Sequence, residues 1–211
     1  MCSSDLDQLL ELMASSSKLC PYLHIPLQSG DDGILTAMNR SYSAQDYVRL
    51  VERALHKIPT LGLGTDIMVG FPGEDDTAFA NTLKLATELP FAYFHVFPFS
   101  PRPGTAAVKL ANPVRATHMK KRMAILTGLS QAKRLAAHNR YIGTTVGVLF
   151  ESGHHDGFAV GTAANFLRVA VPSQLELTNH VYPVTITAAS ERWAVGHLAA
   201  QPPAPTRLPM L

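Results

Sequence analysis

Three short segments of this chain place polar groups directly after apolar, strand-like runs. They are residues 24–30 (HIPLQSG), 65–74 (TDIMVGFPGE) and 95–105 (HVFPFSPRPGT). When parallel strands line up in an α/β barrel, their carboxyl ends share one rim, and that rim holds the chemistry of such folds. The candidate ligand-binding residues are therefore Gln28, Ser29, Gly30, Asp66, Gly70, Gly73, Glu74, Ser100 and Arg102.

In their order and their amino-acid sequences, the three segments resemble the second half of the radical S-adenosylmethionine barrel of the tRNA methylthiotransferases. Met38-Asn39-Arg40 also matches a string of that family. The resemblance covers roughly residues 3–198 and implies an α/β fold followed by a small all-β barrel. The implied parts are the C-terminal half of a partial TIM-type barrel (1–110), a basic linker helix (111–140), a TRAM-like RNA-binding β-barrel (141–199) and a disordered tail (200–211).

The resemblance also implies roles for the strand-end residues. Residues 28–30 would bind the ribose and amino-acid ends of S-adenosylmethionine, although turn chemistry alone also explains a Gln-Ser-Gly string. The glycine turn at residues 70–74 would contact the methionine portion or the adenine. Arg102 is a candidate for an anionic contact, either a cofactor carboxylate or an RNA phosphate. Arg40 would either face the substrate or pair with acidic groups of the barrel.

Two titratable residues lie inside the strand-like runs. Asp66 stands in an apolar segment, where a carboxylate is costly to bury unless it is paired. It is either the partner in a structural ion pair or a polar group that lines the barrel. His24 is either a hydrogen-bonded core or rim histidine or a ligand-binding group.

The cysteine count argues against a metal cluster held by this chain. The family binds its [4Fe–4S] cluster with three thiolates in a C-x-x-x-C-x-x-C loop, whereas this sequence has only Cys2 and Cys20, at a spacing that fits no metal motif. We expect Cys20 to be a buried core thiol, and we interpret residues 154–157 (HHDG) as a turn, so no metal ligand is assigned. The chain therefore looks like the C-terminal portion of a longer enzyme whose N-terminal half, with the cluster, is missing.

Composition narrows the class of protein. Hydrophobic residues make up 46% of the 211 residues, enough for a sizeable core. The sequence contains no apolar run of membrane-spanning length, and its start lacks the basic region of a signal peptide. Two cysteines without a disulfide framework fit a reducing compartment, so we expect a cytoplasmic protein with no membrane partner.

The net charge of +2 conceals a strong asymmetry. Residues 1–88 carry 12 acidic and 6 basic side chains, whereas residues 89–150 carry 9 Lys or Arg and no Asp or Glu. Such a stretch predicts a surface for phosphates, although a solvated basic helix face is the plainer interpretation. An aromatic and an arginine expected on a barrel strand can bind RNA, or can be a core Phe and a solvated Arg. The candidate RNA-binding residues are Arg40, Lys120, Lys121, Arg122, Lys133, Arg134, Phe166 and Arg168.

Periodicity and capping signals predict the elements that position these residues. Strand–helix alternation favours a parallel sheet with helical crossovers, and the five short β-rich runs after Tyr141 favour a closed or nearly closed barrel. Expected helices cover 5–14, 31–38, 43–58, 74–89 and 112–137. Expected strands cover 22–27, 65–71, 93–97, 145–150, 157–160, 167–171, 181–187 and 193–195.

Among the relatives, residues 95–100 and 165–168 look most like the branch that acts on N6-threonylcarbamoyladenosine beside the tRNA anticodon. The reaction implied is methylthiolation of C2 of that adenosine in the anticodon stem-loop. One S-adenosylmethionine yields the radical and another supplies the methyl group. The alternatives are the sibling that acts on isopentenyladenosine, the less favoured sibling that acts on a ribosomal-protein aspartate, and a catalytically inactive RNA-binding fragment.

Overall fold

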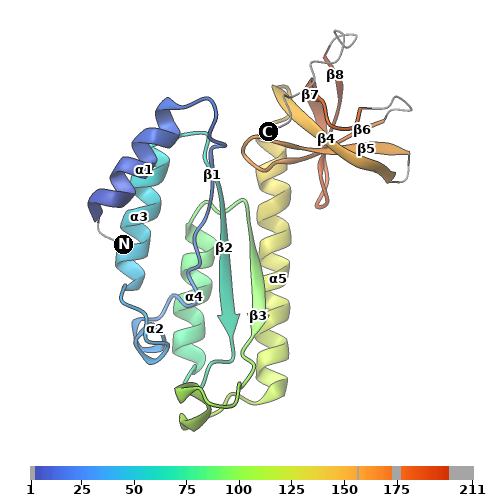
Figure 1. Ribbon diagram of the computed structural model, residues 1–211. Coiled ribbons are helices and arrows are strands. Elements are labelled where there is room, and N and C mark those ends of the chain that lie inside the picture. The colour runs from blue at the N-terminus through green and yellow to red at the C-terminus, as the bar shows by residue number, and fades with distance from the viewer. Residues whose placement is uncertain (1–2, 156, 173–176, 200–211) are drawn as a thin grey trace. The chain divides into compact units, whose positions relative to one another are not determined.

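The computed structural model describes residues 3–155, 157–172 and 177–199 (Figure 1). These residues form two compact units. The first comprises the N-terminal segment through Ser16 together with residues 23–133. The second comprises residues 17–22 and the chain from Arg134 onward. The expected tail at 200–211 lies outside the described residues.

The first unit is built on a three-stranded sheet in the order β1-β2-β3, with β1 at Tyr22–His24, β2 at Gly62–Val69 and β3 at Tyr93–Pro98. Strand β3 runs parallel to β2, and Gln28 extends the β1 edge by a parallel bridge to Ile67. The prediction of a parallel sheet is confirmed.

Three helices cover one face of this sheet. They are α3 (Ala44–Lys57), α4 (Asp76–Glu88) and α5 (Ala116–Asn139). Side chains alternate across each strand, so every second residue enters the core beneath the helices. The core side chains from the strands and their flanks are Leu27, Leu63, Ile67, Val69, Phe91 and Phe94, and those from the helices include Tyr47, Val51, Ala86 and Leu126.

The helix starts agree with their capping signals. Asp31 caps α2 (Asp32–Ala37), Ser43 and Asp46 form a reciprocal capping box on α3, and Asp75 caps α4. Each carboxylate or hydroxyl accepts a backbone N–H that has no partner within its own helix. Helix α1 (Ser3–Ser15) packs Leu10 and Met13 against α3, as its apolar spacing predicts.

Helix α5 differs from the expected free linker. It begins at Ala116 rather than at Pro113, because Asn112 adopts a left-handed conformation (φ 59°) and its carbonyl accepts the Gly73 N–H. Leu126 is fully buried in the sheet core, and Ser130 hydrogen-bonds the backbone of Phe94. The helix through Lys133 is therefore part of the first unit.

The second unit is a closed five-stranded barrel in the order β4-β5-β6-β8-β7. Its interior is one apolar cluster that includes Val148, Phe150, Val169, Val184 and Ile186. The prediction of a small barrel is confirmed. The strands are β4 (Thr145–His155), β5 (Phe158–Ala163), β6 (Arg168–Pro172), β7 (Val181–Ala189) and β8 (Ala194–Leu198).

Two expectations fail locally. Cys20 is exposed rather than buried, because it lies in the irregular segment between α1 and β1 and not on the strand. Strand β4 continues through His155, so the expectation that His154 and His155 lie in a turn is wrong. None of the described helices is both long enough and apolar enough to span a membrane.

Candidate functional site

Gln28 is the most unusual residue at the ends of the parallel strands. It adopts a left-handed conformation with φ 64°, which is rare for a residue other than glycine. Its backbone is inserted into the edge of β2, where its N–H donates to the Asp66 carbonyl and its own carbonyl accepts from the Met68 N–H. Backbone held in such a sparsely populated region is common at ligand-binding sites.

Ser29 and Gly30 have packing roles. Ser29 is 1% exposed, and its hydroxyl lies 3.2 Å from that of Thr82 on α4. A Cβ on Gly30 would lie 2.7 Å from Thr82 Cα and 2.9 Å from the Asn81 carbonyl oxygen. These contacts bring the segment after β1 close to α4, so neither side chain position is open to a ligand.

The Ser29 expectation therefore needs correction, because its hydroxyl is enclosed by the protein. The Gly30 N–H likewise donates to the Thr82 hydroxyl. Of the Gln-Ser-Gly string, only Gln28 keeps a partly exposed side chain.

Glu74 and Arg122 hold the glycine turn that follows β2. Arg122 Nη1 donates to Glu74 Oε1 at 2.7 Å and to the Glu74 carbonyl at 2.9 Å, and Nη2 donates to Asp76 Oδ1 at 2.7 Å. Both Glu74 carboxylate oxygens lie 3.2 Å from the Gly70 N–H that they accept. Burial raises the pKa of Glu74, and the hydrogen bonds from Gly70 and Arg122 oppose that shift.

The hydrogen-bond network of Glu74 and Arg122 changes two expectations drawn from the sequence. The side chains of Arg122 and Glu74 are 6% and 2% exposed, so the expectation that Arg122 lies on an exposed basic face is wrong. Glu74 binds its own turn rather than presenting a carboxylate to a ligand. A buried guanidinium and carboxylate compensate each other's loss of hydration, which explains why neither faces water.

The glycine turn itself contains one open position. Gly70 (φ 84°) packs against Met119, since a Cβ there would lie 2.6 Å from the Met119 sulfur. Gly73 (φ 90°) has nothing within 4 Å of such a Cβ. It borders two shallow hollows of about 420 and 310 Å³, one shared with Arg115 and His118 and the other with Asp31 and Thr77. Gly73 therefore leaves room for a ligand close to its backbone, while its N–H is already donated to the Asn112 carbonyl.

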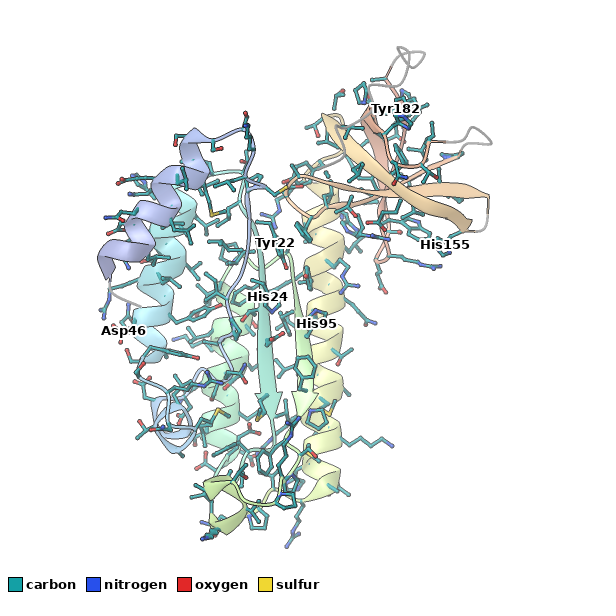
Figure 2. The ribbon with its side chains drawn as sticks, viewed as in Figure 1. Tyr22, His24, Asp46, His95, His155 and Tyr182 are labelled. Carbon is teal, nitrogen blue, oxygen red and sulfur yellow. The ribbon has the colours of Figure 1, made fainter. Side chains whose placement is uncertain are left out.

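A group of polar side chains lies on the face of the sheet opposite the helices (Figure 2). His24 Nε2 lies 3.0 Å from Asp66 Oδ1, with the two side chains 29% and 25% exposed. Asp66 pairs in register with His95, and the His24 and His95 rings are 5.9 Å apart. Asp66 thus has a histidine partner and lies on the face of the sheet without helices.

Sequence analysis did not assign a role to His95. The available signal was the alternation along β3, where Phe94 is buried while Tyr93, His95 and Phe97 point to the other face. Period-2 alternation places all three on the same side as Asp66.

The remaining strand-end candidates are exposed. Ser100 and Arg102 lie in the loop after β3, and the Arg102 carbonyl accepts from the backbone and hydroxyl of Thr105. Arg40 is exposed after Asn39, whose left-handed conformation (φ 57°) ends α2. The Met-Asn-Arg string thus has a local reason, because asparagine tolerates that conformation at a helix end.

The other RNA candidates differ in how accessible their charges are. Lys120 and Lys121 are exposed on α5. Lys133 Nζ donates to the carbonyls of Thr87 and Leu89 at the end of α4, and Arg134 is half-buried.

In the second unit, Phe166 lies in the β5–β6 turn rather than on a strand. It stacks on Tyr22 with ring centroids 4.1 Å apart. Arg168 is exposed at the start of β6 and pairs with Glu151 at 3.0 Å. That hydrogen bond is the main reason that the pKa of Glu151 is lowered.

A protein-family model matches the first part of this chain. Residues 1–86 match the family model of the Radical SAM superfamily. The matched segment contains β1, β2 and the turn from Gly70 to Glu74, and it ends within α4. The match supports an enzyme of the radical S-adenosylmethionine type, for which S-adenosylmethionine and usually an iron–sulfur cluster are expected.

The residues at these strand ends fit S-adenosylmethionine but not an iron–sulfur cluster. Gln28 and Gly73 offer a partly exposed amide and an open backbone position, which suits a polar nucleoside such as S-adenosylmethionine. They do not fit a cluster: within the described ranges, no group of three His, Cys, Asp or Glu side chains could hold a metal ion. The whole sequence has two cysteines, and Cys20 is exposed alone.

Proposed function

We propose that this chain is part of a radical S-adenosylmethionine tRNA methylthiotransferase that acts on C2 of N6-threonylcarbamoyladenosine. The observation that carries the proposal is the left-handed Gln28, whose backbone pairs with Asp66 and Met68 of β2, the strand that leads into the glycine turn. This arrangement puts an amide side chain and open backbone at adjacent strand ends, where α/β proteins bind nucleotides. The Radical SAM match to residues 1–86 supports the same cofactor.

The three parallel strands would be the C-terminal half of a partial TIM-type barrel. In such a barrel the inward face is closed by the remaining strands, and here Asp66, Tyr93 and His95 lie on the face without helices. A polar inward face is appropriate for a lumen that admits a cofactor and a base. The cluster thiolates and the missing strands would come from an N-terminal half outside these residues.

In this proposal the residues of the chain bind and orient rather than react. S-adenosylmethionine, bound with a reduced cluster, supplies the radical chemistry. The Gln28 side chain would hydrogen-bond the cofactor, and Gly73 would allow its close approach to the backbone. Arg102, exposed after β3, would bind an anionic group. Glu74 and Arg122 would keep the glycine turn in position.

The RNA would be the tRNA anticodon stem-loop, bound by the five-stranded barrel as a TRAM-like module and by the exposed lysines of α5. Lys120 and Lys121 are exposed and lie in a stretch of 62 residues without an acidic side chain. A small closed barrel and a basic helix are both common RNA-binding surfaces. The proposed reaction belongs to the cytoplasm, where tRNA is modified.

Nucleoside analysis of tRNA tests the proposal directly. Deleting the gene that encodes this sequence should abolish 2-methylthio-N6-threonylcarbamoyladenosine and raise its unmodified precursor, measured by liquid chromatography with mass spectrometry. Loss of the methylthio derivative of isopentenyladenosine instead would assign the enzyme to the sibling reaction. An unchanged nucleoside profile would refute both.

One observation favours a second function for the chain by itself. With two cysteines and no metal-binding group among the described residues, the chain alone would be a catalytically inactive RNA-binding protein. Anaerobic reconstitution followed by iron and sulfide analysis discriminates the two. About four irons per chain, with 5′-deoxyadenosine formed on reduction, would show a cluster held by this chain and would exclude the inactive protein.

A further inference from the structure

The tryptophan of the second unit lies in a cluster of aromatic and cationic side chains that the sequence did not suggest. Trp193 is the only tryptophan of the chain and is half-buried just before β8. The guanidinium carbon of Arg192 lies 4.2 Å from the centre of its ring system. His155 and Phe158, which pair across the β4–β5 hairpin, each have ring centroids 6.5 Å from it. Figure 2 labels His155 on this hairpin.

The backbone holds Trp193 in a fixed position. The Ser190 hydroxyl accepts the Trp193 N–H at 3.1 Å and donates to the Trp193 carbonyl at 2.9 Å. The Ser190 carbonyl lies 2.6 Å from Nδ1 of His138, which is 3% exposed. Because a carbonyl only accepts, Nδ1 carries the proton, and burial lowers the pKa of His138 so that the ring stays neutral. A rigid aromatic ring loses little entropy on binding.

Phe166, the aromatic side chain that the sequence predicted for RNA binding, is 50% exposed but already has a stacked ring partner. Phe166 already stacks on Tyr22, with an angle of 21° between the rings. Arg168 is committed to Glu151 and Thr162. In contrast, His155 and Phe158 are tilted by 36° and 33° from the Trp193 plane, so neither ring stacks flat on it.

We infer that Trp193, with Arg192, His155 and Phe158, is a binding site for an unpaired RNA base and its phosphate. Indole rings stack on every base, and an adjacent arginine adds a cation–π contact or a phosphate contact. His155, exposed at the end of β4, adds a second polar contact. The inference rests on the proposed RNA-binding function and names the surface of the barrel that carries it.

Tryptophan fluorescence, excited at a wavelength that tyrosine does not absorb, tests the site because Trp193 is the only tryptophan of the chain. The full chain is titrated with a short unstructured oligoadenylate and, separately, with inorganic polyphosphate as a polyanion without bases. Oligoadenylate should quench the emission in parallel with its own binding, followed by the anisotropy of a labelled oligoadenylate. Polyphosphate should not quench it. Equal quenching by both would overturn the inference, since charge alone would then explain binding.

Variants separate this site from the sequence-predicted one. Trp193→Leu should weaken oligoadenylate binding about 5- to 150-fold, the range for loss of one stacked base, whereas Trp193→Phe should retain most of the affinity. Phe166→Ala is the matched control and should have a smaller effect. Should Trp193→Leu unfold the barrel, judged by circular dichroism, Arg192→Met leaves the reporter in place and should still weaken binding.

The failures of the two proposals are distinguishable. Binding of oligoadenylate by wild type without quenching, and with equal affinity in the Trp193 and Arg192 variants, would overturn this site but leave RNA binding intact. No binding to wild type at low salt would overturn both the site and the RNA-binding function.

Discussion

Arg122 on α5 and Glu74 after β2 form a buried ion pair with 2.7 Å between Nη1 and Oε1. Glu74 in turn accepts the N–H of Gly70, so the pair connects the long helix to the first glycine of the turn. Met119, one turn earlier on α5, packs where a Cβ on Gly70 would lie. The position of the glycine turn is therefore set by α5, which follows it by more than 40 residues in the sequence.

The first prediction concerns this pair. Arg122→Met should lower the free energy of unfolding by about 3–5 kcal/mol, because it leaves the Glu74 carboxylate buried without a cation. Adding Glu74→Gln should recover much of that loss, since glutamine still accepts from Gly70 without a charge. Urea denaturation measures both. Lys121→Met, on the exposed neighbour, should change stability by no more than about 0.5 kcal/mol; an equal loss there would contradict the buried pair.

A glycine pair tests the close contact between the segment after β1 and α4. Gly30→Ala should destabilise the fold by about 1–3 kcal/mol, because the new methyl group would meet the α4 backbone at 2.7 and 2.9 Å. Gly128→Ala on α5 is the matched control. It has nothing within 4 Å of a Cβ and should stabilise by about 0.5–1 kcal/mol. Opposite signs in thermal denaturation are expected, and equal signs would disprove the close approach.

Gln28 separates backbone strain from ligand binding. Gln28→Gly should leave stability equal or raise it by about 1 kcal/mol, because glycine adopts φ 64° without a steric cost. The same variant should weaken binding of S-adenosylhomocysteine to the cluster-containing enzyme, measured by calorimetry, since the amide is lost. Gln28→Asn keeps an amide, so its affinity for S-adenosylhomocysteine should lie between those of wild type and Gln28→Gly. Unchanged affinity in Gln28→Gly would make Gln28 a purely structural residue.

Acid pH should weaken the start of α3. The hydrogen bonds from the Ser43 side chain and backbone, with a further one from Arg49, lower the pKa of Asp46 to about 2. A carboxylate with a folded pKa below its unfolded value contributes stability above about pH 4 and loses it as pH falls toward 2. The difference in melting temperature between wild type and Asp46→Ala should shrink over that interval. A carbon-detected NMR titration that gives Asp46 an ordinary pKa would contradict the capping box.

Salt dependence tests the basic surface of α5. Replacing Lys120 and Lys121 with glutamate should weaken tRNA binding and reduce the log–log salt slope by roughly 0.7 to 0.9 for each lost phosphate contact. Lys84→Glu, on α4 and outside the acid-free stretch, is the control and should leave the slope unchanged. Equal affinity of the double variant and wild type at low and moderate salt would identify these lysines as a solvated face only.

Local features of the fold were predictable from the sequence. The N-caps Asp31, Ser43 and Asp75 depend on residues within three positions of each helix start, and the buried alternation of β2 depends on its own residues. The five short strands were identified, although their closure into the order β4-β5-β6-β8-β7 pairs residues far apart in the chain.

The candidate site was predictable only in outline. The string Gln28-Ser29-Gly30 predicted a ligand site at a strand end, but its contacts depend on α4, which the string does not show. Thr82 encloses Ser29 and excludes a side chain at Gly30. Arg122 looked like one more exposed cation on a basic helix, because its acidic partners lie 46 and 48 residues away in the sequence. Cys20 was expected in the core because it borders an apolar run, yet it lies outside the strand.

The sequence by itself determined the element types, the N-caps of α2, α3 and α4, the charge asymmetry and the lack of a cluster-binding cysteine set, because each depends on residue types and short spacings. Only the tertiary structure decided which polar groups remain exposed. Burial and ion pairing depend on which elements come together, and that placed Arg122 in the core, left Gln28 and Gly73 at the strand ends, and gathered Arg192 and Trp193 beside His155.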